Sequence, residues 1–192
     1  MTRSWQARVG PLIAGARRRG ALAGAALLAT AVAGCGGAGP WFVDVTADAG
    51  LDVRYHTRGD RMLMPEINGG GVAVFDYDRD GDLDIYATNG NDRLPDTAPD
   101  PNHTDRLLRR EADGRYTDVT AASGLGDPYF SMGVAIGDVD NDGDEDLLVT
   151  NYGPDRLYSN RGDGTFVDAT AASGIDSPGW SSAAVFFDYD RD

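Results

Sequence analysis

The chain has 192 residues, with 31 acidic side chains against 17 basic ones and a formal net charge of −14 at pH 7. This acidic excess argues against nucleic acid as a partner, because proteins bind the phosphate backbone mainly through basic side chains. All but three of the acids are aspartate, which favours turns and metal-binding loops over a general solubilising surface.

The N-terminal segment differs from the rest, because its first 34 residues contain no acid and carry five arginines ahead of an apolar run at residues 21–33. The run is shorter than the roughly 20 residues of a membrane span and has the length of a signal-peptide core. It ends in Val-Ala-Gly-Cys at Cys35, which resembles the lipobox of bacterial lipoproteins.

We therefore expect residues 1–34 to be a lipoprotein-type signal peptide, Cys35 to be lipidated, and residues 35–40 to be a short tether. The protein would then be exported, facing the periplasm or the cell surface, and held at the membrane only through its N-terminal lipid. The alternative is ordinary cleavage after a small residue, with Cys35 incidental.

Residues 76–84, DYDRDGDLD, place an aspartate at every second position. In a strand these carboxylates would form a row of like charges, and Asp and Gly suit a helix poorly, whereas a turning loop points them at one spot. Loops of the form D-x-D-x-D-G supply oxygen ligands to Ca²⁺, with glycine at the sharp turn. The alternative is a solvated acidic turn; magnesium fits less well, and zinc lacks a nearby histidine or thiol.

The pattern recurs at residues 138–146, DVDNDGDED, and begins again at residue 188 as DYDRD. Three occurrences favour Ca²⁺ loops over solvated turns. The predicted metal residues are Asp76, Asp78, Asp80, Asp82 and Asp84 in the first loop, Asp138, Asp140, Asp142, Asp144 and Asp146 in the second, and Asp188, Asp190 and Asp192 in the third.

Other segments repeat at an offset of 50 residues: YTDVTAASGL at residue 116 matches FVDATAASGI at residue 166, and Asp-Arg-Leu occurs at residues 105 and 155. Within each unit, the sequence predicts a strand, a metal loop, a second strand, a loop, a third strand, a tight turn and a fourth strand. Four short strands in a unit of this length match the size of a propeller blade. The first unit is longer on both sides of its metal loop. The runs GVAVF and GVAIG predict inner strands buried on both faces, and no segment after residue 40 shows a helical period.

GVAVFDYDRDGDLDIYATNG, the N-R-G-D-G-T-F turn and the D-x-T-x-x-x-G link resemble FG-GAP/VCBS repeats. More narrowly, FVDVTADAGLDVRYH and MPEINGGG ahead of the first loop resemble the cartilage acidic protein-like family, whose bacterial members often carry an ASPIC/UnbV domain. The resemblance implies an all-β fold, a seven-bladed β-propeller with calcium loops as in integrin α-subunits, over residues 41–192. Because the sequence stops inside a third loop, we expect only the first two to three blades, truncated at the C-terminus, with residues 42–45 as an unpaired outer strand.

The resemblance and the loops together predict a calcium-binding scaffold for binding or adhesion to an unknown protein or carbohydrate. An EF-hand would need glutamate at loop position 12, where Ala87 and Val149 stand. We expect no catalysis from these residues, since His56 and His103 are the only histidines and no nucleophile–base set is evident. The alternative is a propeller-based enzyme, for example one acting on carbohydrate, with catalytic residues further along. Arg-Gly-Asp occurs at residues 58–60 and 161–163. The second tripeptide lies in a predicted tight turn, where the backbone conformation favours Gly and Asp.

Overall fold

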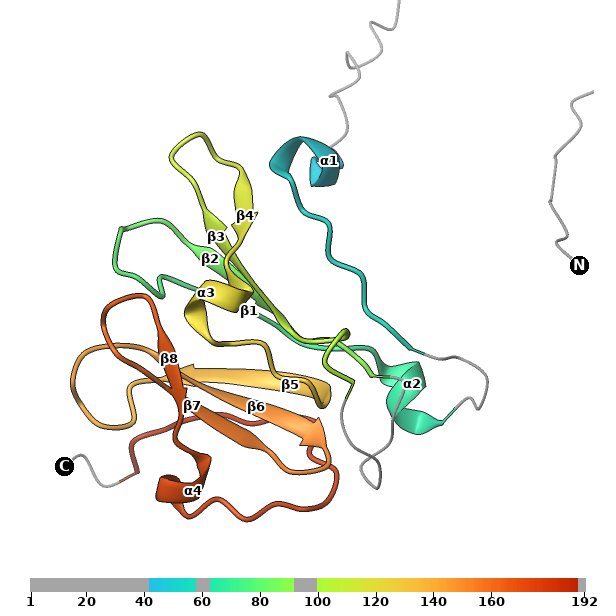
Figure 1. The fold of residues 1–192 in the computed structure, drawn as a ribbon, viewed down its shortest axis with the longest axis vertical. Coiled ribbons are helices and arrows are strands. Elements are labelled where there is room, and N and C mark those ends of the chain that lie inside the picture. The colour runs from blue at the N-terminus through green and yellow to red at the C-terminus, as the bar shows by residue number, and fades with distance from the viewer. Residues whose placement is uncertain (1–41, 58–62, 92–99, 190–192) are drawn as a thin grey trace, which may run out of the picture. The chain divides into compact units, whose positions relative to one another are not determined.

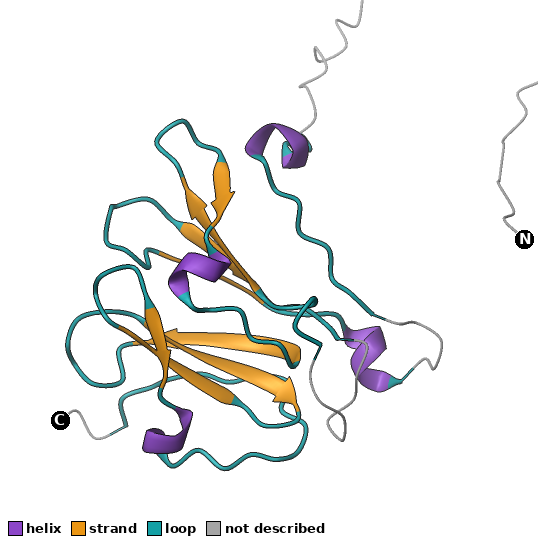
Figure 2. Ribbon diagram, in the orientation of Figure 1, coloured by secondary structure: helices purple, strands orange, loops and turns teal. Residues whose placement is uncertain are grey.

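The computed structural model describes residues 42–57, 63–91 and 100–189. Short strands predominate over single-turn helices (Figures 1 and 2). The elements in chain order are α1 (Thr46–Ala49), α2 (Met64–Asn68), β1 (Val72–Phe75), β2 (Asp84–Ala87), β3 (Arg106–Arg110), β4 (Tyr116–Asp118), α3 (Thr120–Ser123), β5 (Phe130–Gly137), β6 (Asp146–Tyr152), β7 (Arg156–Asn160), β8 (Phe166–Asp168) and α4 (Thr170–Ser173).

The strands form two four-stranded antiparallel sheets, each with its strands in sequence order, β1 to β4 and β5 to β8 (Figure 1). The registers are equivalent, since Phe75 pairs with Asp84 in the first sheet and Gly137 pairs with Asp146 in the second. The predicted all-β class and the four strands per unit are therefore confirmed. Over the described residues, these two sheets do not close a ring.

The hydrophobic core lies between the facing sides of the two sheets. It brings Phe75, Tyr86 and Leu107 of the first unit together with Leu147 and Val149 of the second. A fully buried side chain of this size contributes about 1.5–3 kcal/mol, so this interface holds the two sheets together.

The expectation that GVAVF is buried on both faces is wrong. Burial alternates along β1, and the outward side chains Val72 and Val74 are 64% and 56% exposed. Their counterparts Val134 and Ile136 in β5 are partly buried because they pack against the core formed with the first sheet. No described residues cover the corresponding side of the first sheet.

A single helical turn follows the last strand of each sheet, α3 in the first unit and α4 in the second. Asp118 Oδ1 accepts the backbone N–H of Thr120 at 3.0 Å, and Thr120 Oγ1 accepts the N–H of Leu107 at 2.9 Å. The turn ends at Gly124, whose φ of +81° is a left-handed conformation that favours glycine. Four residues are too short to show a helical period, so the D-x-T-x-x-x-G link gives no helical signal in the sequence.

Two segments predicted as strands lie outside the sheets. Residues 42–45 are exposed and form no strand, in keeping with the expected lack of a partner. In the third unit, residues 181–188 also form no strand, contrary to expectation, and the nearest pairing is an isolated bridge between Tyr152 and Trp180. A hairpin partner equivalent to β2 is absent from the described part of that unit. Nor does any described helix have the length and apolar character needed to cross a membrane.

A fully buried carboxyl, that of Asp105, precedes β3. Its Oδ1 accepts the backbone N–H of Asn89 at 2.6 Å, and its Oδ2 lies 2.8 Å from the hydroxyl of Tyr86. Burial and the nearby carboxyl of Asp127 raise the pKa of Asp105 well above its usual value. A proton on Oδ2 lets Asp105 donate to the Tyr86 oxygen, while the Tyr86 O–H donates to the carbonyl of Leu125 at 3.3 Å. When Asp105 is protonated, all these groups are paired.

Asp105→Ala should lower the free energy of unfolding by about 2 kcal/mol or more, because each buried partner left unpaired costs about 1–3 kcal/mol. Asp105→Asn retains an acceptor for Asn89 and a donor toward Tyr86, so it should cost less than about 1 kcal/mol. Urea unfolding at neutral pH measures both losses, and equal losses in the two variants would contradict this account.

The pH dependence of the free energy of unfolding provides a control for the role of Asp105. Because the pKa of Asp105 is higher in the folded chain, its protonated form stabilises the fold fully below about pH 4, the range of an unfolded aspartate. That contribution is lost as pH rises toward the folded-state pKa. Asp105→Asn does not titrate and should remove this decline.

Candidate metal centres

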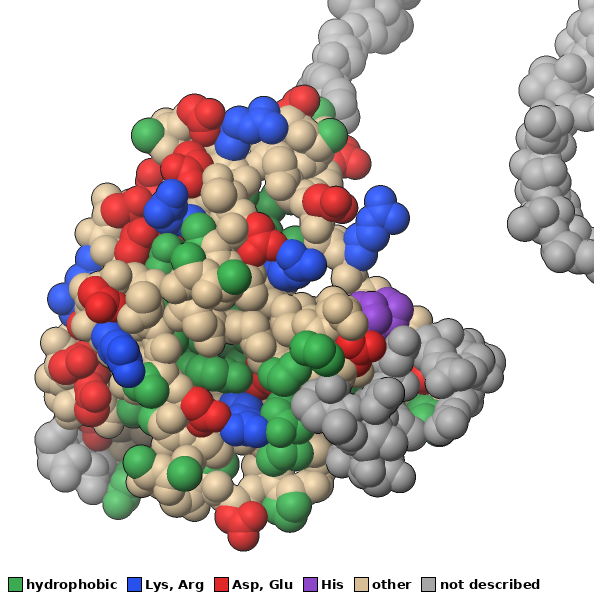
Figure 3. All heavy atoms as spheres, in the orientation of Figure 1, with side chains coloured by type: hydrophobic (Ala, Val, Ile, Leu, Met, Phe, Trp, Pro, Cys, Tyr) green, Lys and Arg blue, Asp and Glu red, His purple; other side chains and the backbone are tan. Residues whose placement is uncertain are grey.

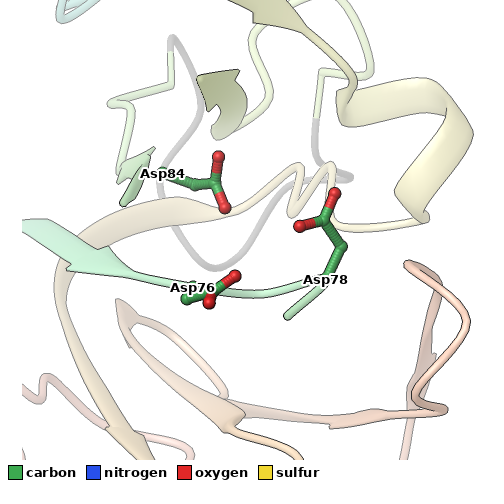
Figure 4. A group of neighbouring side chains, drawn as sticks. All are labelled: Asp76, Asp78 and Asp84. Atoms are coloured by element: carbon green, nitrogen blue, oxygen red, sulfur yellow. The ribbon is translucent and has the colours of Figure 1, made fainter. Parts of the chain in front are cut away.

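The two complete aspartate loops connect β1 to β2 and β5 to β6, at equivalent places in the two sheets. Asp76, Asp78 and Asp84 each bring one carboxylate oxygen within 4.8 Å of the others, with their side chains turned toward one another in Figure 4. The second loop repeats the arrangement with Asp138, Asp140 and Asp146. The first, third and ninth loop positions therefore meet in both units.

The first aspartate of each loop stabilises the turn by accepting backbone hydrogen bonds. Asp76 accepts the backbone N–H groups of Asp80 and Gly81 at 3.1 and 3.0 Å, and Asp138 accepts that of Gly143 at 2.9 Å. Gly81 has a φ of +92°, which only glycine adopts without strain. The glycine at loop position 6 is thus required by the backbone.

The ninth position is the first residue of the second strand, where Asp84 is fully buried. Its two oxygens accept the N–H of Tyr77 at 3.3 Å and that of Arg110 at 2.7 Å. Burial raises the pKa of Asp84 to about 6, although these hydrogen bonds act in the opposite direction. Asp146 has the same environment, accepting from Val139 and from β7, and burial raises its pKa too.

The third position shows that the cluster fits a cation. Asp78 Oδ1 is buried without a hydrogen-bond partner, and burial together with Asp80 raises the pKa of Asp78. A bound cation would supply the missing partner. Because every ligand offered is oxygen, the centre suits a hard divalent ion such as Ca²⁺.

The fifth and seventh positions do not join the clusters. Asp80 and Asp142 each accept the backbone N–H two residues ahead, at 2.8 Å in both loops. The seventh-position side chains pair with arginines, Asp82 with Arg110 and Asp144 with Arg79. Asp188 of the third loop is exposed, and Asp190 and Asp192 lie outside the described residues.

Three residues around the centres were not anticipated from sequence: Arg79, Arg110 and Asn160. Arg110 and Asn160 both end the third strand of a unit, and their backbone N–H groups contact Asp84 and Asp146 equivalently. Their 50-residue offset is a signal that could have found them. The side chain of Arg79 projects from one metal loop to the next, which only the arrangement of the sheets determines.

The histidines lie away from the metal loops. His56 and His103 stack with ring centroids 3.6 Å apart beside a pocket of about 510 Å³. The backbone N–H of His56 donates to Asn89 Oδ1 at 2.7 Å, and this hydrogen bond connects the segment that carries His56 to the residues that follow β2. Figure 3 shows histidine side chains at the surface.

The second Arg-Gly-Asp lies in the turn between β7 and β8, where Gly162 has a φ of +69° and Asp163 accepts the backbone N–H of Thr165 at 3.0 Å. The turn thus uses Gly162 and Asp163 as the sequence predicted. The first tripeptide, at residues 58–60, lies outside the described residues, as do Cys35 and the predicted signal peptide.

Comparison with known families gives two matches to the FG-GAP-like repeat, over residues 91–149 and 138–192. Together they span more than half of the chain, and both contain the loop at residues 138–146. No curated protein matches the chain.

The geometry predicts different effects of two substitutions on stability when divalent ions are removed by a chelator. Asp78→Asn should raise the free energy of unfolding by up to about 1 kcal/mol, because it removes a partly buried charge that lies near other carboxylates. Asp82→Asn is the matched control and should give no gain, because it removes the partner of Arg110. Denaturant unfolding in chelator checks this, and a loss of stability in Asp78→Asn would contradict it.

Proposed function

The chain belongs to the FG-GAP-like repeat family, and we propose that it is a calcium-binding β-propeller scaffold on an exported, lipid-anchored protein. The scaffold binds or adheres to a protein or carbohydrate ligand. Within the family, the proposed relationship is to cartilage acidic protein-like proteins, on the motifs ahead of the first metal loop.

The observation that carries the calcium proposal is the repetition of one aspartate triad at the same place in two sheets. Convergence of three carboxylates is unfavourable without a counter-charge, and two independent copies support a common ligand. The ion would bind Asp76, Asp78 and Asp84 in the first centre and their equivalents in the second. Its role is structural, since it neutralises the triad and fixes the tip of the first hairpin.

The propeller proposal rests on the way in which the two sheets stack. Val134 and Ile136 pack against the core shared with the first sheet, whereas the equivalent Val72 and Val74 are exposed. A further blade placed before the first sheet covers these valines. Repetition of this packing step generates a ring, whose loops are free to vary and carry the ligand contacts.

Calorimetry on the wild-type chain should detect two calcium ions, in the range of about 10⁻⁴–10⁻³ M that extracellular modules can show. Asp78→Ala and Asp140→Ala should each remove one ion, because each deletes a carboxylate from one triad. Asp176→Ala, an exposed aspartate outside both loops, is the control and should retain two. No calcium uptake by the wild type would overturn the proposal.

The lipid proposal rests on Val-Ala-Gly-Cys after the apolar run. In a bacterial host, wild-type protein should incorporate labelled palmitate and Cys35→Ser should not, since the substitution removes the thiol that would carry the lipid. The variant should also change in processing. Equal labelling of the two proteins would refute lipidation at Cys35.

A further inference from the structure

We infer that the two metal centres are coupled, so that an ion in the first raises the affinity of the second, through the Asn160 amide and the Arg79–Asp144 ion pair. The inference rests on the proposed calcium binding and adds to it a route between the sites.

Asn160 connects the loops directly. It is 3% exposed at the end of β7, and its Nδ2 donates to the carbonyl of Tyr77 in the first loop at 2.9 Å and to that of Glu145 in the second at 3.3 Å. Its backbone N–H donates to Oδ1 of Asp146, a member of the second triad, at 2.8 Å. One buried residue therefore forms hydrogen bonds both to the first loop and to a carboxylate of the second centre.

Arg79 makes the second connection. It lies between two aspartates of the first loop with a φ of +59°, and its Nε is 2.9 Å from Oδ1 of Asp144. The Asp144 side chain is only 10% exposed, so the pair is shielded from solvent on one side. Asp144 also donates its backbone N–H to Asp142 Oδ1, which places it within the second loop's own hydrogen bonds.

The first centre differs. At the position of Asn160 it has Arg110, whose guanidinium pairs with Asp82 of the same loop. The first centre is therefore held by its own unit, whereas the second is held partly by the loop of the unit before it.

The ion in the first centre should raise the affinity of the second because it lowers the free-energy cost of ordering the second loop. Without an ion, repulsion within the first triad opposes the arrangement that places the Tyr77 carbonyl and Arg79 toward the second loop. An ion in the first centre fixes both groups, so the second ion binds to a loop that is already ordered. Repulsion between the two ions acts the other way, and solvent and salt screen it because both loops lie near the surface.

Calcium calorimetry on the full chain tests this. In the wild type, the product of the two association constants should exceed the product of the single constants of Asp78→Ala and Asp140→Ala by at least about fivefold, the low end of typical coupling. The ratio of these two products is the coupling factor. When it is measured in an Arg79→Gln or an Asn160→Ala background, it should be near one. Arg161→Gln changes an exposed arginine that takes no part in the Asn160 or Arg79 contacts, and it should leave the factor unchanged.

The outcomes separate the two claims. Two bound ions with a coupling factor near one in the wild type would overturn the inference and leave the proposed function standing. A factor that persists in both the Arg79→Gln and Asn160→Ala backgrounds would overturn the route. Absence of calcium uptake would overturn the proposed function, and the inference with it.

Discussion

A buried aspartate at the start of the second strand is the constraint on which each unit depends. Asp84 and Asp146 are almost fully excluded from solvent, and each accepts one N–H from its metal loop and one from the third strand. This places a carboxylate where the first and third loop aspartates converge. Three carboxylates thus lie close together, so the same residue that organises the hairpin also completes the acidic cluster that we propose as a cation site.

Buried aspartates also lie at the opposite ends of the strands, where hydrogen bonds hold them. Asp105 and Asp155, 50 residues apart, each accept the backbone N–H of an asparagine, Asn89 just beyond β2 and Asn151 near the end of β6. Asp155 also accepts the hydroxyls of Ser177 and Ser181, at 2.6 and 2.7 Å, from the segment that follows α4. Buried, hydrogen-bonded aspartates therefore lie at both ends of the strands of a unit, and at the metal-loop end they are joined by two further loop aspartates.

Sequence alone predicts what is local and repeated: four strands per unit, the glycine turns and the loops that hold the aspartates. It does not distinguish the aspartates that converge in the triads from the other loop aspartates, because the positions of the Asp82 and Asp144 side chains depend on arginines brought in by strand pairing and by the neighbouring sheet. It overestimates the burial of Val72 and Val74, since an apolar run is buried on both faces only where both neighbours are present. The helical turn after each sheet is too short to leave a periodic signal.

The central claim is that two equivalent triads, each from loop positions 1, 3 and 9, form oxygen-ligated divalent-cation centres. A crystal structure grown with calcium tests it most directly. The account predicts one ion in each loop, at about 2.3–2.6 Å from carboxylate oxygens of Asp76, Asp78 and Asp84 and of Asp138, Asp140 and Asp146. Ordered loops without ions, or ions bound elsewhere on the loop surface and not by these residues, would contradict it.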